Sequence, residues 1–402
     1  MRVRELTLED FDAHCRVSAM AFHWSYKKEE EELPEDLDER FLGCFDDDGS
    51  ILADLEFAVR PAVVGETTLP VVQIGGVASL PFARRKGAVR KLFGELEAIA
   101  EREGWAFGAL YPFATAYYRK FGYETTLREL RLEVPMQHLN DLAEDAPEDA
   151  PGKIELVEGE RGLPELLEVY NAFARMHQLM CLRETKHYFN TNPMEDKAYS
   201  CLWRDGEGEA QGYVSYHLDT DSHNLEVKEL AYLTPEALTG LLCYLRVYNK
   251  ADKVCFNAVP LDSPLLLALR EFSHLNMVHR CTASYRLYDP VTLLRAHRYP
   301  KQPGDFTFAI AGDSLKRCNG TYVVEYADGK AEVHQLPTDI PASLTLTREA
   351  AARLLLGGQA WTPFALRFCP GVKLAEGEDA EAEIENFVRA FGAAPTIMWD
   401  GF

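Results

Sequence analysis

A cluster of cations and one glycine follows an apolar run near residue 85. Arg84, Arg85, Lys86 and Gly87 come after VVQIGGVASL and precede a segment with helical spacing. A strand, a glycine-containing turn and a helix N-terminus together form an anion site, because the first amides of a helix lack intrahelical partners. Arg90 would add charge, and Gly87 would allow close backbone approach. The residues alone leave two interpretations open, a phosphate site or a solvated basic turn.

The elements that must position this cluster predict a mixed α/β fold. RELTLEDFDAHCRVSAMAF predicts a short strand and then a helix whose start carries Thr7 and Asp10 in capping-box spacing. Two strands flank the turn DDDGS, and VVQIGGVAS predicts a buried strand. GAVRKLFGELEAIAEREG has helical spacing and a plausible stop at Gly104. WAFGALYPF, ATAYYRKFGYE and a last strand, ELRLEV, complete this part.

The composition divides the rest of the chain into a linker and two further domains. QHLNDLAEDAPEDAPGK is acidic and Pro-rich, as linkers are. Residues 154–289 repeat the first α/β order in weaker form, without a counterpart of the cationic loop, and residues 290–402 give strands, an Ala- and Leu-rich helix and an apolar end. We therefore expect an α/β (α+β) protein with domains at 1–136, 154–289 and 290–402 and a linker at 137–153.

Charge and cysteine usage exclude several classes of function. The formal net charge of −22 argues against non-specific binding of nucleic acid or of anionic membranes, and favours cationic ligands. The nine cysteines form no CxxC pair, so neither a disulfide framework nor a metal site is expected. The sequence has no signal-peptide core and no apolar run near ~20 residues, which predicts a cytoplasmic protein.

Two motifs resemble those of the GNAT acetyltransferases. VASLPFARRKGAV resembles their acetyl-CoA loop, Arg/Gln-x-x-Gly-x-Gly/Ala, with Arg84 and Gly87 in place and Val89 where the last small residue stands. YYRKFGYE resembles their late Tyr-x-x-x-Gly-Phe/Tyr signature, here from Tyr118 to Tyr123. The whole chain resembles the enhanced intracellular survival (Eis) family, which joins two GNAT-like folds to a C-terminal domain similar to sterol carrier proteins.

The resemblance implies roles for the matched residues. The backbone of Val77, Ala78 and Ser79 would hold the acetyl and pantetheine parts of acetyl-CoA. The pyrophosphate would lie against the loop and the start of the helix, at Arg85, Lys86, Gly87, Ala88, Val89 and Arg90. Phe113 and Ala114 would line the thioester end of the site.

The resemblance also implies the groups that move protons. Tyr118 would protonate the leaving thiolate, and the terminal carboxylate of Phe402 would take a proton from the attacking amine, which must be unprotonated to react. A core aromatic at Tyr118 and a packed plug at Phe402 are the structural alternatives. Trp24 and Asp400 are candidates for the acceptor pocket. The family's acidic residue beside the terminal Phe is replaced here by glycine, with Asp400 one place earlier.

These features predict an acetyl-CoA-dependent N-acetyltransferase for a small polycationic amine such as an aminoglycoside, acting by direct transfer in a ternary complex. The resemblance further implies a homo-oligomer, a hexamer. Two alternatives stay open: a protein or peptide lysine N-acetyltransferase, and a lipid-binding module that uses the C-terminal domain. Motifs of other enzyme classes, GxSxG, HExxH and GxxxxGK[ST], are absent from the sequence.

Overall fold

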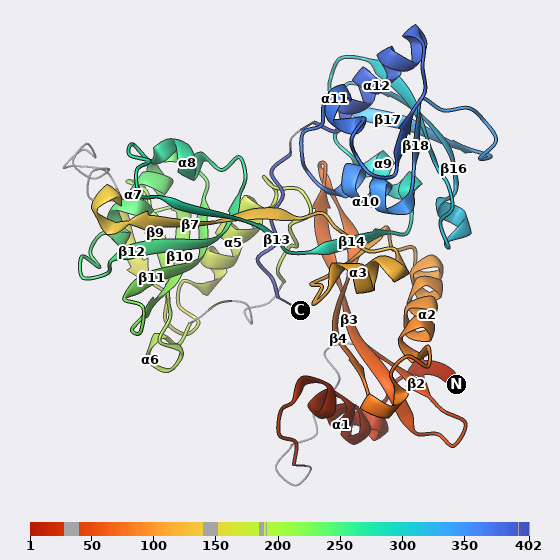
Figure 1. The fold of residues 1–402 in the computed structure, drawn as a ribbon. Coiled ribbons are helices and arrows are strands. Elements are labelled where there is room, and N and C mark those ends of the chain that lie inside the picture. The colour runs from red at the N-terminus through yellow and green to blue at the C-terminus, as the bar shows by residue number, and fades with distance from the viewer. Residues whose placement is uncertain (28–39, 140–151, 185–188, 190, 393, 402) are drawn as a thin grey trace. The chain divides into compact units, whose positions relative to one another are not determined.

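The computed structural model describes residues 1–27, 40–139, 152–184, 189, 191–392 and 394–401 (Figure 1). They form two compact units. One contains Met1–Thr126 with Ala283–Gly392, and the other contains Leu127–Thr282 with the segment up to Gly401. The domain division predicted from the sequence stays a prediction. The compact units are defined by contacts within the chain, and these do not show where one domain ends and the next begins. None of the helices among the described residues is long and apolar enough to cross a bilayer.

The first unit contains a seven-stranded sheet in the order β1-β2-β3-β4-β5-β14-β6. Neighbouring strands are antiparallel except for β4 and β5, which are parallel. The strands are β1 (Arg2–Glu5), β2 (Arg40–Phe45), β3 (Ile51–Val64), β4 (Thr67–Ser79), β5 (Phe107–Leu110), β6 (Glu124–Thr125) and β14 (Ser284–Leu287).

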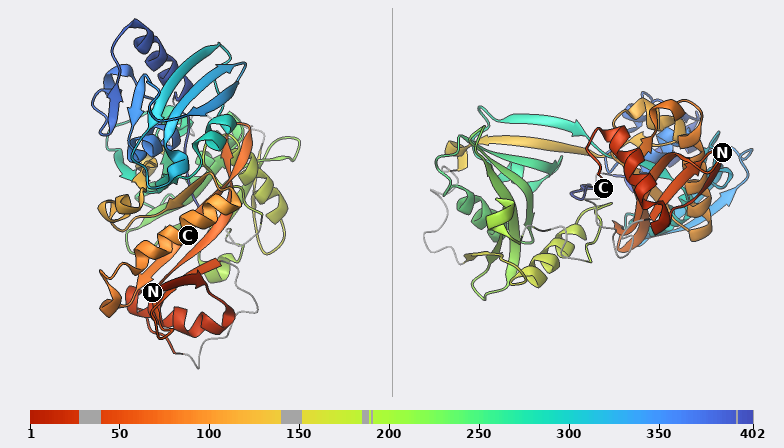
Figure 2. Two further views of the ribbon diagram at one scale, coloured as in Figure 1. Left: turned by 90° about the vertical axis from the view of Figure 1, so that its right-hand side faces the viewer. Right: turned by 90° about the horizontal axis from the view of Figure 1, so that it is seen from below.

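Two helices of the first unit pack on separate apolar clusters of this sheet. The 16-residue helix α2 (Ala88–Glu103) buries Leu92, Phe93 and Leu96 in the larger cluster, as its helical spacing predicts. Helix α1 (Phe11–Phe22) contributes Val17 to the smaller one. A one-turn helix, α3 (Thr115–Tyr118), follows β5. Figure 2 shows α2 lying along the sheet of this unit.

A second sheet in the same unit is built from residues 304–374, in the order β17-β16-β15-β18-β19. Helix α12 packs on β15, where Phe387 stands edge-on to Phe306. The resemblance of this part to sterol carrier proteins stays a prediction. Its elements are α9 (Pro290–Ala296), β15 (Gly304–Ile310), β16 (Gly320–Ala327), β17 (Lys330–Leu336), β18 (Leu344–Leu346), α10 (Arg348–Leu356), α11 (Pro363–Leu366), β19 (Val372–Leu374) and α12 (Glu378–Ala390).

The second unit contains a seven-stranded sheet in the order β13-β7-β12-β11-β10-β9-β8, in which β11 and β12 are the parallel pair. Read from β8, this order matches that of the first sheet read from β1. The elements are β7 (Arg128–Pro135), β8 (Lys153–Leu156), α5 (Leu163–Ala174), α6 (Pro193–Asp196), β9 (Tyr199–Arg204), β10 (Ala210–Asp219), β11 (Asn224–Tyr232), α7 (Pro235–Leu245), β12 (Lys253–Pro260), α8 (Pro264–Ala268) and β13 (Asn276–Cys281).

The two seven-stranded sheets exchange strands. β6 and β7 are close in sequence but lie in different sheets, and so do β13 and β14. The strand next to β5 is therefore the late strand β14, and the strand next to β12 is the early strand β7. The segment ELRLEV, expected as the last strand of the first α/β part, is β7, and it pairs with β12 and β13 in the second of these sheets. Local sequence patterns do not specify such non-local pairing.

Candidate active site

The first sheet opens between β4 and β5. The two strands pair in parallel over Val71–Ile74 and Phe107–Leu110, and β4 then continues to Ser79 with β3 as its partner. Within the described residues, the other edge of this last part of β4 has no strand beside it. An open strand edge offers backbone amides and carbonyls to an extended ligand. The stretch predicted to hold the pantetheine arm, Val77 and Ala78 through Ser79, lies on this edge.

A β-bulge bends β4 just before that stretch. Asp54 pairs with Ala78 and Glu56 pairs with Gly75, so β4 carries one more residue than β3 over this interval. Gly76 has a φ of +50°, and a Cβ there would lie 2.9 Å from the carboxyl carbon of Glu56. The positive φ favours glycine at this position, and a larger residue would also displace the side chain of Glu56. Bulges of this kind re-aim a strand next to a binding site.

The segment after β4 ends in a helix N-terminus without a side-chain cap. A 3-10 turn (Pro81–Ala83) leads to Arg85, with a φ of 64°, and then to Gly87, the N-cap of α2, with a φ of 90°. Gly87 has no side chain to bond the first amides of α2, at Ala88 and the next two residues, and a helix leaves these amides without internal partners. The free amides and the positive end of the helix dipole form an anion site.

Four cations surround this helix start. Arg84, Arg85, Lys86 and Arg90 are all exposed, and none has a carboxylate partner within the part of the chain that the structure describes. Their charge is therefore available to a ligand. Val89, which stands where the family motif has a small residue, is half-buried and packs against the core cluster.

Tyr118 lies at the end of α3 with only 4% of its surface exposed. Its ring stands edge-on to Phe93 of α2 and to Phe113, with centroids 6.1 and 5.4 Å apart. Burial, and to a smaller degree the neighbouring Tyr117, raises the pKa of the Tyr118 phenol. The phenol therefore keeps its proton at neutral pH, as a general acid must.

The structure brings several of the predicted site residues of the first unit together. Ala88 and Tyr118 belong to one core cluster, against which Val77 and Val89 pack. Phe113 stands beside Tyr118 and is 75% exposed, which suits a residue that lines an opening. Ala114 is the N-cap of α3, and its carbonyl accepts the amide of Tyr118 at 3.4 Å.

The other predicted residues lie elsewhere in the chain. Trp24, just after α1, is exposed and stands edge-on to Tyr26. Asp400 is buried in the second unit, and its carboxylate accepts bonds from Arg183 and Tyr170. Phe402 lies outside the described residues.

One polar pair near β4 was not found by sequence reasoning. Nδ1 of His14 on α1 lies 3.0 Å from a carboxylate oxygen of the fully buried Asp54, which pairs with Ala78 across β3 and β4. The second oxygen of Asp54 has no partner among the described residues, and burial raises the pKa of this carboxyl group. The available signal was an acidic residue inside the apolar run ILADLEFAV. The pair is able to hold a proton beside the candidate cofactor strand.

Comparison with known families supports this description. Two family profiles match, each described as an acetyltransferase (GNAT) domain, one over residues 2–126 and the other over residues 179–288. N-acetyltransferase Eis from Mycobacterium bovis is 26% identical over 312 residues, which cover 74% of each chain. N-acetyltransferase Eis from Mycobacterium tuberculosis is 25% identical over the same share of each chain.

Solved structures show the same fold over the full length of the chain. A probable N-acyltransferase from Enterococcus faecalis has a TM-score of 0.81 at 19% identity, and the match covers 100% of this chain and 99% of that one. A GCN5-related N-acetyltransferase from Anabaena variabilis has a TM-score of 0.80 at 19% identity, covering all of both chains. Eis1 from Mycobacterium abscessus has a TM-score of 0.78 at 18% identity, again over both whole chains. The chain thus contains two GNAT acetyltransferase domains and is similar to the Eis N-acetyltransferases over 74% of its length, and as a GNAT acetyltransferase it uses acetyl-CoA as its acetyl donor.

Proposed function

We propose that this enzyme acetylates amines of a small polycationic acceptor, such as an aminoglycoside, by direct transfer in a ternary complex. The observation that carries the proposal is the combination in one unit of an open strand edge, an uncapped helix start with four exposed cations, and a buried phenol that keeps its proton. The site contains what a thioester donor and its leaving thiolate need, and no covalent enzyme nucleophile is required.

The pyrophosphate would accept hydrogen bonds from the first amides of α2. The positive charges of Arg85, Lys86 and Arg90 would offset its negative charge. The open edge of β4 would pair with the pantetheine arm as an added strand. Acetyl-CoA supplies a thioester carbonyl that an unprotonated amine attacks. Phe113 and Ala114 would line this end of the site, beside the phenol of Tyr118.

Two proton transfers complete the reaction. The terminal carboxylate of Phe402 would accept the proton that the amine loses as its nitrogen bonds the acyl carbon. The phenol of Tyr118 would donate a proton to sulfur as the carbon–sulfur bond breaks, so that the products are an amide and a thiol. The role of Phe402 rests on the family resemblance, and the pair of His14 with the buried Asp54 is the alternative proton acceptor.

The acceptor proposal rests on charge and on aromatic side chains. The net charge of −22 raises the local concentration of cations around the protein. An open hollow of about 650 Å³ on α1 is lined by Asp12, Trp24 and Tyr26, and an amine would be attracted by such ring faces and by the carboxylate. Arg16 and Lys27 also line this hollow, so its charge is mixed. Asp400 stays a proposed acceptor residue on the resemblance alone.

The test is mass spectrometry of kanamycin, and of a lysine-containing peptide, after incubation with acetyl-CoA and protein whose intact mass confirms an end at Phe402. We expect acetylated kanamycin, and much less of it from a chain extended by four residues beyond Phe402. Equal product from both chains would mean that the terminal carboxylate is not the base, and Asp54 and His14 would be the next groups to test. Product from the peptide alone would favour protein lysines. If neither substrate reacts while a fluorescent fatty acid binds, the lipid-carrier alternative would replace the proposal.

A further inference from the structure

The second sheet opens in the same way as the first. β11 and β12 pair in parallel over Asn224–Val227 and Lys253–Phe256, four residues on each strand, and then separate. By position after the last paired residue, Glu229 to Tyr232 of β11 stand where Gly76 to Ser79 stand on β4. The second fold thus retains the opening that receives the pantetheine arm in the first.

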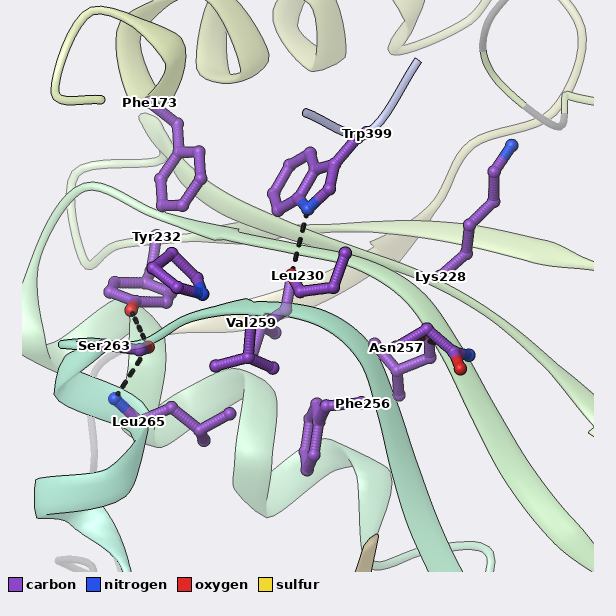
Figure 3. A pocket seen from close by; sticks show the side chains of 13 residues that line it. Phe173, Lys228, Leu230, Tyr232, Phe256, Asn257, Val259, Ser263, Leu265 and Trp399 are labelled. Atoms are coloured by element: carbon purple, nitrogen blue, oxygen red, sulfur yellow. Dashed lines mark hydrogen bonds between the residues drawn. The ribbon is translucent and has the colours of Figure 1, made fainter. Parts of the chain in front are cut away.

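The C-terminal segment of the chain lies in this second opening. The indole of Trp399 donates to the carbonyl of Ala258 on β12 at 3.1 Å, and its ring is stacked on Phe173 of α5 with centroids 5.1 Å apart. Figure 3 shows the indole beside Phe173 and facing Leu230 of β11. Ile397, two residues earlier, is fully buried.

Little space is left around Trp399. The cavity that β11, β12 and the indole enclose has a volume of about 20 Å³, room for about one water molecule. Farther back, the amide of Gln178 donates to the carbonyl of Pro395 at 2.7 Å, so backbone bonding also fixes the segment. The opening of the second fold is therefore filled by the chain itself.

A buried ionic network fixes the residue after Trp399. Nε and Nη2 of Arg183 donate to one carboxylate oxygen of Asp400 at 2.8 and 2.5 Å, and Tyr170 donates to the other at 3.2 Å. The same guanidinium makes a two-pronged pair with Glu229 of β11, at 2.7 and 3.1 Å. The side chains of Arg183, Glu229 and Asp400 are each at most 5% exposed.

The segment is thus tied to both strands of the opening. Trp399 bonds β12, and Asp400 reaches β11 through Arg183 and Glu229. A bidentate pair to guanidinium fixes direction as well as distance, because its donors lie in one rigid plane. Gly401 follows directly, and the next residue is Phe402.

We propose that the second GNAT-like fold binds the C-terminal segment and thereby positions the C-terminal carboxylate. Arg183 is the positioning residue, and the side chain of Asp400 is the group that it binds. This inference rests on the proposed function, in which that carboxylate is the base. It explains why the second fold keeps the opening without a cationic loop: its ligand is a peptide segment of the same chain.

Asp400→Asn removes the ion pair between Arg183 and Asp400 with little disturbance of the second unit. Arg183 retains its pair with Glu229 in this variant, so no buried charge is left without a partner, whereas removal of Arg183 would leave two buried carboxylates. Asp221→Asn is the matched control, because Asp221 is exposed in the β10–β11 turn. Hydrogen exchange of residues 394–401, the dissociation constant for acetyl-CoA and kcat with kanamycin would be measured for all three full-length proteins.

We expect Asp400→Asn to speed hydrogen exchange in residues 394–401 and to leave acetyl-CoA affinity unchanged. We expect kcat to fall by about tenfold to a hundredfold, since a general base contributes about 10²–10⁴-fold. Unchanged exchange would overturn the anchor. Faster exchange with unchanged kcat would overturn the positioning role and leave the anchor. A wild-type chain that acetylates no amine would refute the proposed function and with it the positioning role, while the exchange result would still decide the anchor.

Discussion

The two openings in this chain begin alike, but the segments that come after them differ. Each parallel pair, β4 with β5 and β11 with β12, joins four residues per strand before the strands part. After β4 the chain reaches α2 through a cationic turn, and the N-cap, Gly87, offers no side chain to the helix amides. After β11 it reaches α7 through Thr234, whose hydroxyl accepts the amide of Ala237 at 3.1 Å.

The start of α7 is thereby closed to anions. One of its early amides is bonded to Thr234, Pro235 has no amide hydrogen, and Glu236 places a negative charge in the first turn. The start of α2 has none of these features. A phosphate therefore gains amide bonds at α2 that it cannot gain at α7.

The comparison teaches that the shared fold supplies an opening and that a few residues decide what fills it. Cations and an uncapped helix suit a nucleotide cofactor in the first fold. A capped helix, with Trp399 and a buried guanidinium, holds a peptide in the second. Fold similarity alone would assign both openings the same ligand.

The largest expected effect tests whether the first opening is the catalytic one. Tyr118→Phe removes the proton donor and keeps the ring that packs on Phe93 and Phe113. We expect kcat to fall by about 10²–10⁴-fold, the usual contribution of a general acid, with acetyl-CoA affinity unchanged. Timed assays of the thiol released from acetyl-CoA measure kcat, and titration calorimetry measures the affinity for acetyl-CoA.

The matched control for Tyr118→Phe is Tyr117→Phe, which removes a neighbouring phenol on the same turn. Its kcat should stay at the wild-type value. If both variants lost activity equally, the effect would lie in the packing of α3 rather than in proton donation.

The strands beside the two openings should differ in how their charged residues make the free energy of unfolding depend on pH. In the first sheet β14 carries the buried Arg286, which is paired with Asp313. In the second, β7 carries Glu129, opposite Arg280 on β13, and burial raises the pKa of its carboxyl group to about 7 against the opposing effect of Arg280. The folded state therefore binds this proton more tightly than the unfolded state, where the pKa is about 4.3.

The contribution of Glu129 to the free energy of unfolding is thus fully present below about pH 4.3 and is lost as pH rises to about 7. We expect Glu129→Gln to gain stability relative to wild type over this window, by on the order of 2 kcal/mol. Urea unfolding at several pH values measures the difference, and Glu209→Gln, at an exposed turn residue, is the control. A difference that does not change with pH would contradict the raised pKa.

The start of α2, which we propose as the pyrophosphate site, can be tested at Gly87. Gly87 and Gly104 cap the two ends of α2, both have positive φ (90° and 73°), and neither has a heavy atom within 4 Å of an added Cβ. Alanine at either site should lower the free energy of unfolding by about 1–2 kcal/mol, because a Cβ is strained in this conformation. Only Gly87→Ala should also weaken acetyl-CoA binding, by about tenfold (~1.4 kcal/mol), since its methyl group blocks approach to the amides.

Calorimetric titration of both alanine variants with acetyl-CoA decides this point. Equal affinity for the two would mean that the pyrophosphate does not approach Gly87. Equal loss of affinity would mean that α2 responds to strain at either end, and the anion site would then not be local.

Much of the first fold could be predicted from the sequence because its signals are local. The apolar run VVQIGGVAS lies within β4, the helical spacing after Gly87 gives α2, and Gly104 ends it in the left-handed conformation, as predicted. Thr7 and Asp10 form the expected capping box, although it begins a 3-10 turn, Leu8–Asp10, that directly precedes α1. Each of these depends on residues within a few positions of one another.

The rest could not be predicted because it depends on residues far apart in the chain. The place of β14 between β5 and β6 is set by pairing with residues more than 150 positions away. Hydrophobic periodicity describes only neighbouring residues and does not predict such pairing. The same holds for Arg183, which meets Asp400 from 217 residues away and carries no motif of its own. A charged residue near a chain end normally indicates solvent exposure, and only the structure shows this one buried.

The smallest expected effect sharpens the comparison at α7. Thr234→Ala removes the cap and should lower the free energy of unfolding by about 1 kcal/mol, whereas Thr239→Ala, on the exposed side of the same helix, should change it by less than about 0.5 kcal/mol. Freeing this amide should not create a second cofactor site, because Pro235 and Glu236 remain and Trp399 still fills the opening. Titration with acetyl-CoA should therefore give one equivalent bound per chain in wild type and in both variants. Two equivalents in Thr234→Ala would show that the cap alone excludes the cofactor, and the filling of the opening by the C-terminal segment would then be secondary.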